Sequence, residues 1–151
     1  MYFQSQKELI IKSQIKMEKN TIKALFVNGG PRKNKNTAQM LLRAMQGAQE
    51  ADAEVELVHL YDIDYKGCKS CFACQLKNAR TDGVCAIRDN LRPLLEKARE
   101  ADVIVIGSPV YFSYPTGETR SFLERLIFPN LPTTTTRRAT AADLSARNRR
   151  L

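Results

Sequence analysis

The sequence predicts a single α/β domain built around a parallel sheet. Three β-rich segments, at residues 22–27, 54–60 and 102–107, alternate with amphipathic segments of helical periodicity. Such alternation joins parallel strands through right-handed helical crossovers. At 151 residues the chain is long enough for one domain with a sizeable core.

The first strand and helix are the firmest elements. Residues 22–27 are β-branched, aromatic or aliphatic apart from Lys23, and the turn sequence Asn28-Gly29-Gly30-Pro31 ends them. We expect Asn36 or Thr37 to cap the following helix. Its apolar face comprises Ala38, Leu41, Met45 and Ala48.

The later elements complete the alternation. Residues 54–60 alternate charged and apolar side chains, which favours a strand near a sheet edge, whereas the Val-Ile-Val-Ile run within 102–107 is typical of a central strand. Asp89 or Asn90 is expected to cap the helix before that run, and a last helix is expected over 116–128. No strand pattern follows Pro129, so the predicted sheet has three clear strands and is incomplete against the usual five.

Two loops fall at the carboxyl edge of this sheet, where open α/β sheets bind ligands. The loop from Asn28 to Thr37 offers backbone amides and a helix N-terminus to a phosphate. It matches neither a Walker loop nor a G-x-G-x-x-G loop, and a plain polar loop is the alternative. The second loop, residues 107–112, carries Tyr111 and Phe112, which could pack on a flat ring or simply cover the sheet.

Four cysteines fall close together in the chain, at Cys68, Cys71, Cys74 and Cys85. Their spacing admits a [4Fe–4S] cluster, a zinc site, or free thiols, which we favour. The gap of ten residues before Cys85 weakens the cluster interpretation.

Composition argues against several classes of partner. The net charge is +8, but residues 1–20 account for +2 and residues 129–151 for +4, which leaves +2 for residues 21–128. We therefore expect no nucleic-acid partner. No segment is long and apolar enough to span a membrane and no signal peptide is evident, so we expect a cytoplasmic protein. The lone His59 lies in a predicted strand and is expected to be structural.

Three motifs occur in the order found in NADPH-dependent FMN reductase-like flavoproteins, a group that includes iron–sulfur flavoproteins: residues 28–37, 67–74 and 107–112. The resemblance covers about residues 22–129. It implies a flavodoxin-like three-layer sandwich with the three strands in order 2-1-3. It also implies FMN as cofactor, NAD(P)H as cosubstrate, a small-molecule or protein electron acceptor, and a homodimer or higher homo-oligomer.

The resemblance also implies site residues. Those for the FMN phosphate are Gly30, Arg32, Asn34, Asn36 and Thr37. Those that line the isoalloxazine ring are Pro109, Val110, Tyr111 and Phe112. Gly30 stands where such proteins often have Ser, and nothing after Pro129 matches the two further strands that they contain.

The expected organisation is a tag remnant or extension at residues 1–16, a flavodoxin-like FMN-binding domain at 17–129, and a Thr/Arg-rich tail at 130–151. The expected function is an FMN-dependent NAD(P)H oxidoreductase in which the flavin performs the chemistry and no side chain acts as acid or base. The alternatives are an iron–sulfur flavoprotein electron carrier and a truncated, non-catalytic flavodoxin-like module.

Overall fold

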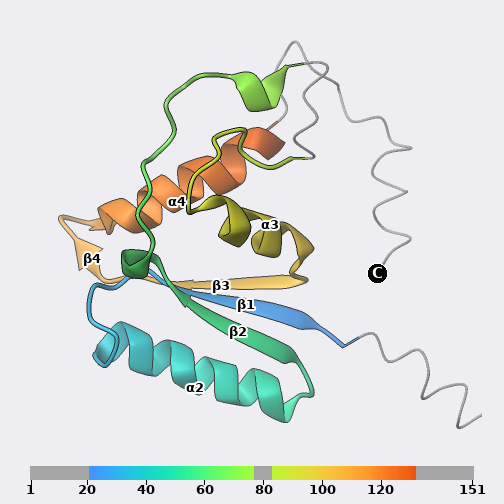
Figure 1. Cartoon of the computed structure of the whole chain (residues 1–151). Coiled ribbons are helices and arrows are strands. Elements are labelled where there is room, and N and C mark those ends of the chain that lie inside the picture. The colour runs from blue at the N-terminus through green and yellow to red at the C-terminus, as the bar shows by residue number, and fades with distance from the viewer. Residues whose placement is uncertain (1–20, 77–82, 132–151) are drawn as a thin grey trace, which may run out of the picture.

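The computed structural model describes residues 21–76 and 83–131. Its main sheet contains three parallel strands in the order β2-β1-β3, as predicted. The strands are β1 (Lys23–Asn28), β2 (Glu54–His59) and β3 (Val103–Gly107). In register, Asn28 lies opposite both His59 and Gly107, so the three strands end level with one another. The loops that follow them therefore meet at one edge of the sheet (Figure 1).

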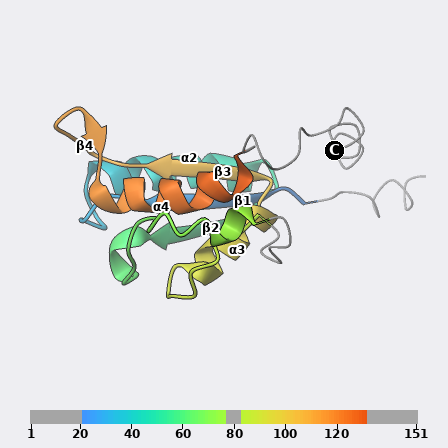
Figure 2. The same cartoon turned by 90° about the horizontal axis from the view of Figure 1, so that it is seen from above.

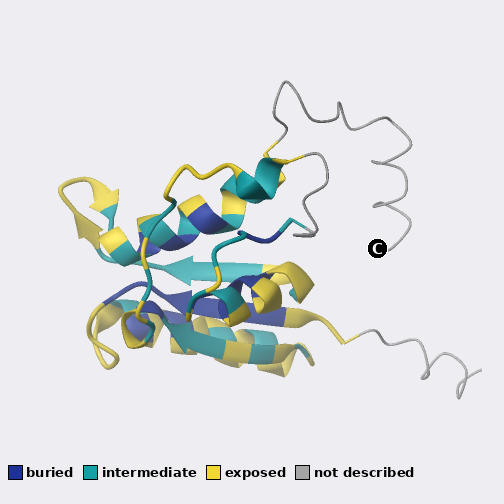
Figure 3. Ribbon diagram, turned by 45° about the horizontal axis from the view of Figure 1, so that its top comes forward, coloured by how far each residue is buried: buried dark blue, intermediate teal, exposed yellow. Residues whose placement is uncertain are grey.

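Helices cover both faces of this sheet. Figure 1 and Figure 2 show α2 (Asn36–Glu50) on one face and α3 (Arg92–Glu100) with α4 (Gly117–Ile127) on the other. Side chains alternate along β1, so Phe26 packs with α2 while Val27 belongs to the core beneath α3 and α4. Residues 24–28 of β1 are consequently buried, as the dark blue strand in Figure 3 shows.

The expectation of a central strand at residues 102–107 is wrong for the described sheet. β3 pairs with β1 alone and so forms an edge. Its apolar pattern has another cause, because Val105 packs toward α2 while Ile104 and Ile106 pack toward α3 and α4. An apolar run indicates that both faces of a strand are covered, but it does not indicate whether both of its edges are paired with other strands.

The two expected side-chain caps are also wrong, although the helices themselves are found. α2 has Lys35 at its N-cap and no capping side-chain hydrogen bond. α3 has Leu91 in that position, likewise uncapped by a side chain. Asp89 does accept a hydrogen bond from the Leu91 amide at 3.2 Å, but it also forms an ion pair with Arg125.

A short hairpin that the sequence did not reveal follows β3. It consists of β4 (Val110–Tyr111) and β5 (Tyr114–Pro115), paired antiparallel. Phe112 and Ser113 form its tip with φ angles of 50° and 68°, and positive φ at both central residues is the signature of a tight type I′ turn. The hairpin stands out from the carboxyl edge of the sheet (Figure 3).

Within the described residues, single-turn helices also occur as η1 (Leu60–Asp62), η2 (Ala73–Gln75) and η3 (Phe128–Asn130), the last directly after α4. The expected extension at residues 1–16 and all but the first two residues of the expected tail lie outside the described residues, so the domain boundaries stay predictions. Within residues 21–76 and 83–131, no helix is long and apolar enough to cross a membrane.

Candidate functional site

The loops after β1 and β3 touch at the carboxyl edge of the sheet. The Gly29 amide donates a hydrogen bond to the Gly107 carbonyl at 2.7 Å. A Cβ atom placed on Gly30 would lie 3.5 Å from Cδ of Pro109 and 3.5 Å from Cβ of Thr37. The phosphate-type loop, the aromatic loop and the start of α2 therefore lie next to one another at this edge, as predicted from the topology (Figure 1).

Gly29 is fixed between this surface and α4. A Cβ atom at Gly29 would lie 1.8 Å from Oγ1 of Thr119, a distance at which no side chain fits. Thr116 Oγ1 donates to the Gly29 carbonyl at 2.7 Å and accepts from the Thr119 amide at 3.3 Å. The buried Thr116 therefore caps α4 and anchors the loop at once. Sequence reasoning placed it at a helix start and missed this second role.

The anion half of the site is open and uncapped. Residues 31–36 are exposed, and α2 begins without a capping side chain or an acidic residue in its first turn. Free amides and the positive end of the helix dipole both favour a phosphate there. Among the predicted phosphate residues, Arg32, Asn34 and Asn36 are exposed and Thr37 is half-buried. These groups fit a phosphate monoester.

Gly30 differs from the other predicted phosphate residues. It is buried, and its amide donates to Oδ1 of Asn28 at 2.9 Å. That amide is thus engaged within the protein, so Gly30 shapes the loop while the donors open to an anion lie from Arg32 onward.

Lys33 is the second basic residue of the loop, and it forms an ion pair with Asp62 at 2.6 Å. Arg32 forms no ion pair within the described residues. Of these two neighbouring cations, Arg32 is the one open to an anion.

The hairpin supplies an aromatic surface beside the loop. Pro109 is half-buried, whereas Val110, Tyr111 and Phe112 are exposed, with Phe112 at 99%. The guanidinium of Arg120 lies 5.3 Å from the ring centroid of Tyr114, a cation–π contact between α4 and the hairpin. Exposed aromatic groups next to an anion site suit a ligand that joins a flat ring to a phosphate.

The cysteines share one region without forming a ligand set. Cys71 is exposed, Cys68 and Cys74 are half-buried, Cys85 is buried, and all four are free thiols. Burial raises the pKa of Cys74, and the neighbouring thiols, Cys85 first, raise it further. No three His, Cys, Asp or Glu side chains among residues 21–76 and 83–131 are placed to hold a metal ion. This arrangement does not fit a cluster or zinc.

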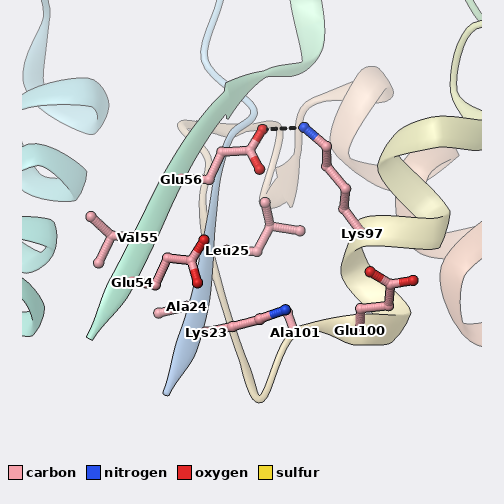
Figure 4. Close-up of a pocket in the computed structure, with 9 residues that line it drawn as sticks. All are labelled: Lys23, Ala24, Leu25, Glu54, Val55, Glu56, Lys97, Glu100 and Ala101. Atoms are coloured by element: carbon pink, nitrogen blue, oxygen red, sulfur yellow. Dashed lines mark hydrogen bonds and ion pairs between the residues drawn. The ribbon is translucent and has the colours of Figure 1, made fainter. Parts of the chain in front are cut away.

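A separate hollow lies at the opposite, amino edge of the sheet (Figure 4). Its lining combines charged and small apolar side chains: Lys23, Glu54, Glu56, Lys97 and Glu100 with Ala24, Leu25, Val55 and Ala101. Glu56 forms an ion pair with Lys97 across it, so part of its charge is neutralised internally. It faces away from both loops and is no part of the candidate site.

Fold and loops together define a doubly wound α/β protein with a candidate anion site at the carboxyl edge of its sheet. Residues 22–145 match the family described as NADPH-dependent FMN reductase. The chain belongs to this family, and the predicted flavodoxin-like fold is confirmed.

Curated relatives include an iron–sulfur flavoprotein of Archaeoglobus fulgidus, 39% identical over 104 residues, which are 69% of this chain and 48% of that protein. An iron–sulfur flavoprotein of Methanocaldococcus jannaschii is 31% identical over 104 residues, 69% of this chain and 51% of that protein. One of Methanosarcina thermophila is 28% identical over 106 residues, 70% of this chain and 53% of that protein. The chain thus spans about half the length of these relatives.

Proposed function

We propose that this chain forms the FMN-binding domain of a flavin-dependent oxidoreductase. One observation carries the proposal: the uncapped N-terminus of α2 and the exposed aromatic hairpin lie at the same edge of the sheet, joined by the contact of Gly29 with Gly107. Family membership supports FMN as the ligand that combines a phosphate with a flat redox ring.

The phosphate would bind to the loop from Arg32 to Thr37. Arg32 supplies a charged donor, and Asn34, Asn36 and Thr37 supply polar side chains beside the free amides of α2. Gly30 contributes the close approach of the backbone, since its amide is already bonded to Asn28. The ring would lie against Pro109, Val110, Tyr111 and Phe112.

FMN, when bound, supplies hydride and single-electron transfer, which we propose runs from NAD(P)H to a small-molecule or protein acceptor. The protein's part is to bind, orient and shield the ring. Packing of the ring against the hairpin would remove the exposed apolar surface of the hairpin from water, which stabilises the complex. The chemistry requires no acid or base from the described side chains.

A second candidate function is an iron–sulfur electron carrier. The names of the relatives and the Cys68, Cys71, Cys74 spacing favour it. The described positions of the thiols do not fit a cluster, and we therefore derive no electron path through one. Anaerobic reconstitution with iron and sulfide, followed by metal analysis of the protein and of a Cys71→Ser variant, tests this candidate.

Titrations with FMN and with riboflavin, which lacks the phosphate, test the leading proposal. We expect FMN to bind more tightly than riboflavin. Replacing Arg32 with Met should lower the affinity for FMN about tenfold, because a charge-assisted hydrogen bond to the phosphate is lost. Lys33→Met is the matched control, because Lys33 is paired with Asp62, and it should change FMN affinity much less. Equal affinities for FMN and riboflavin, or equal effects of the two substitutions, would contradict the proposed site.

A further inference from the structure

A chain of hydrogen bonds through the buried Asn28 connects the end of β2 to the phosphate-type loop. Asn28, the last residue of β1, is fully buried and lies opposite His59 in the sheet. Its side chain contacts Nδ1 of His59 at 2.9 Å on one side and the amide of Gly30 at 2.9 Å on the other. A buried polar side chain of this kind is costly unless both ends are bonded.

The chemistry of the three groups fixes their orientation. The Gly30 amide can only donate, so the oxygen of the Asn28 side chain must face it. The Asn28 nitrogen then faces His59 and donates to Nδ1. Nδ1 of His59 must therefore be the accepting nitrogen in this arrangement.

We propose that Asn28 and His59 are positioning residues for the phosphate loop. His59 holds the Asn28 side chain in one of its two amide orientations. Asn28 in turn holds the Gly30 amide inward and turns the chain toward Arg32. The inference rests on the proposed function, because it assigns the exposed donors from Arg32 to Thr37, and not the Gly30 amide, to the phosphate.

Loss of the accepting nitrogen of His59 would break this chain of two hydrogen bonds, here called the Asn28–His59 relay. Without a partner at residue 59, the Asn28 nitrogen is buried and unsatisfied, and rotation of the amide would point that nitrogen at the Gly30 donor. Either outcome loosens the turn at Gly30. The aromatic hairpin takes no part in this chain of bonds. A separate hydrogen bond, from the Thr116 amide to Oγ of Ser108 at 3.0 Å, joins the two residues that flank the hairpin. The defect should therefore fall on phosphate binding and leave ring binding unaffected.

Two similar-sized substitutions separate the bond from the packing. His59→Asn places a carbonyl oxygen near the position of Nδ1 and keeps the acceptor, whereas His59→Leu has a similar shape and no acceptor. Each variant is titrated with FMN and with riboflavin, and exchange of the Gly30 amide is measured by NMR in the flavin-free protein. Thermal unfolding shows that each variant is folded.

We expect His59→Leu to lower the affinity for FMN about tenfold, while the affinity for riboflavin stays within about twofold of the unsubstituted protein. The same substitution should speed exchange of the Gly30 amide. His59→Asn should restore both properties. Unchanged FMN affinity in His59→Leu, equal losses for FMN and riboflavin, or no rescue by His59→Asn would overturn the relay. If the unsubstituted protein itself shows no preference for FMN, the proposed function fails, and Gly30 exchange alone then decides whether the relay exists.

Discussion

Arg125 of α4 and Asp89 form a two-point ion pair, with Nη1 to Oδ2 at 2.5 Å and Nη2 to Oδ1 at 2.9 Å. The Arg125 guanidinium also donates to the carbonyls of Lys66 at 3.1 Å and Ile87 at 3.3 Å. One buried side chain thus holds both ends of residues 66–89, the segment that carries all four cysteines, against α4.

Removal of Arg125 should destabilise the protein severely. Arg125→Met leaves the half-buried Asp89 and two carbonyls without their partner, and loss of these charge-assisted hydrogen bonds should cost about 1.5–3 kcal/mol of unfolding free energy. Urea unfolding measures this loss. Arg120→Met, on the exposed side of the same helix, should cost less than about 1 kcal/mol. Equal losses of unfolding free energy for the two substitutions would show that the Arg125–Asp89 pair contributes no more stability than an exposed arginine.

Acid should remove the same interaction. Hydrogen bonding to Arg125 holds the pKa of Asp89 below its ordinary value, against the smaller opposing effect of burial. A lowered folded-state pKa gives stability that is complete above the ordinary aspartate pKa of about 3.9 and is lost as pH falls toward the folded-state value. Unfolding measured against pH should show this loss. An Asp89→Asn variant should show a shallower acid dependence, and an unchanged slope would exclude Asp89 as its source.

Two glycines provide opposite substitution effects. Gly29→Ala places a Cβ atom 1.8 Å from buried Thr119 and should cost about 1–3 kcal/mol. Gly47→Ala in α2 meets no atom within 4 Å and should stabilise the helix by about 0.5–1 kcal/mol. Melting temperatures of the two variants should therefore move in opposite directions. A harmless Gly29→Ala change would show that the contact between the loop and α4 is looser than described.

The cysteines should differ in reactivity. Cys71 is exposed and should be alkylated first, whereas the buried Cys85 should react last. Burial and neighbouring thiols raise the pKa of Cys74, so its thiolate forms only at higher pH and its rate should keep rising above the ordinary cysteine range. Peptide mass spectrometry after timed iodoacetamide treatment measures each rate. Uniform rates at all four positions would contradict the described burial.

Hydrophobic periodicity is a local signal, so the sequence was sufficient for the strands, the helices and the layers, whereas the strand order was predicted from the flavodoxin-like arrangement. β1 is shifted by one residue from its predicted bounds, and α4 begins at Gly117, one residue after the predicted start of the last helix. The motif at 28–37 also lies at the carboxyl edge, as a strand–loop–helix unit requires.

The rest depends on long-range contacts that no local pattern encodes. Arg125 looks like a solvated helix residue in the sequence, and only packing against Asp89 explains its burial. Asn28 looks like a turn former, although its buried bond to His59 spans 31 positions. The hairpin tip was missed because Phe112 adopts a left-handed conformation that aromatic residues rarely take. An Asn that ends a strand just before Gly-Gly was the available hint for the relay.

The most direct test of the FMN site is a visible absorption spectrum of the purified chain after incubation with FMN and removal of free flavin by gel filtration. We predict that the protein emerges yellow, with the flavin bands shifted by the aromatic hairpin, and that Arg32→Met carries less flavin. A folded but colourless protein, equal to a sample never exposed to FMN, would contradict the proposed site.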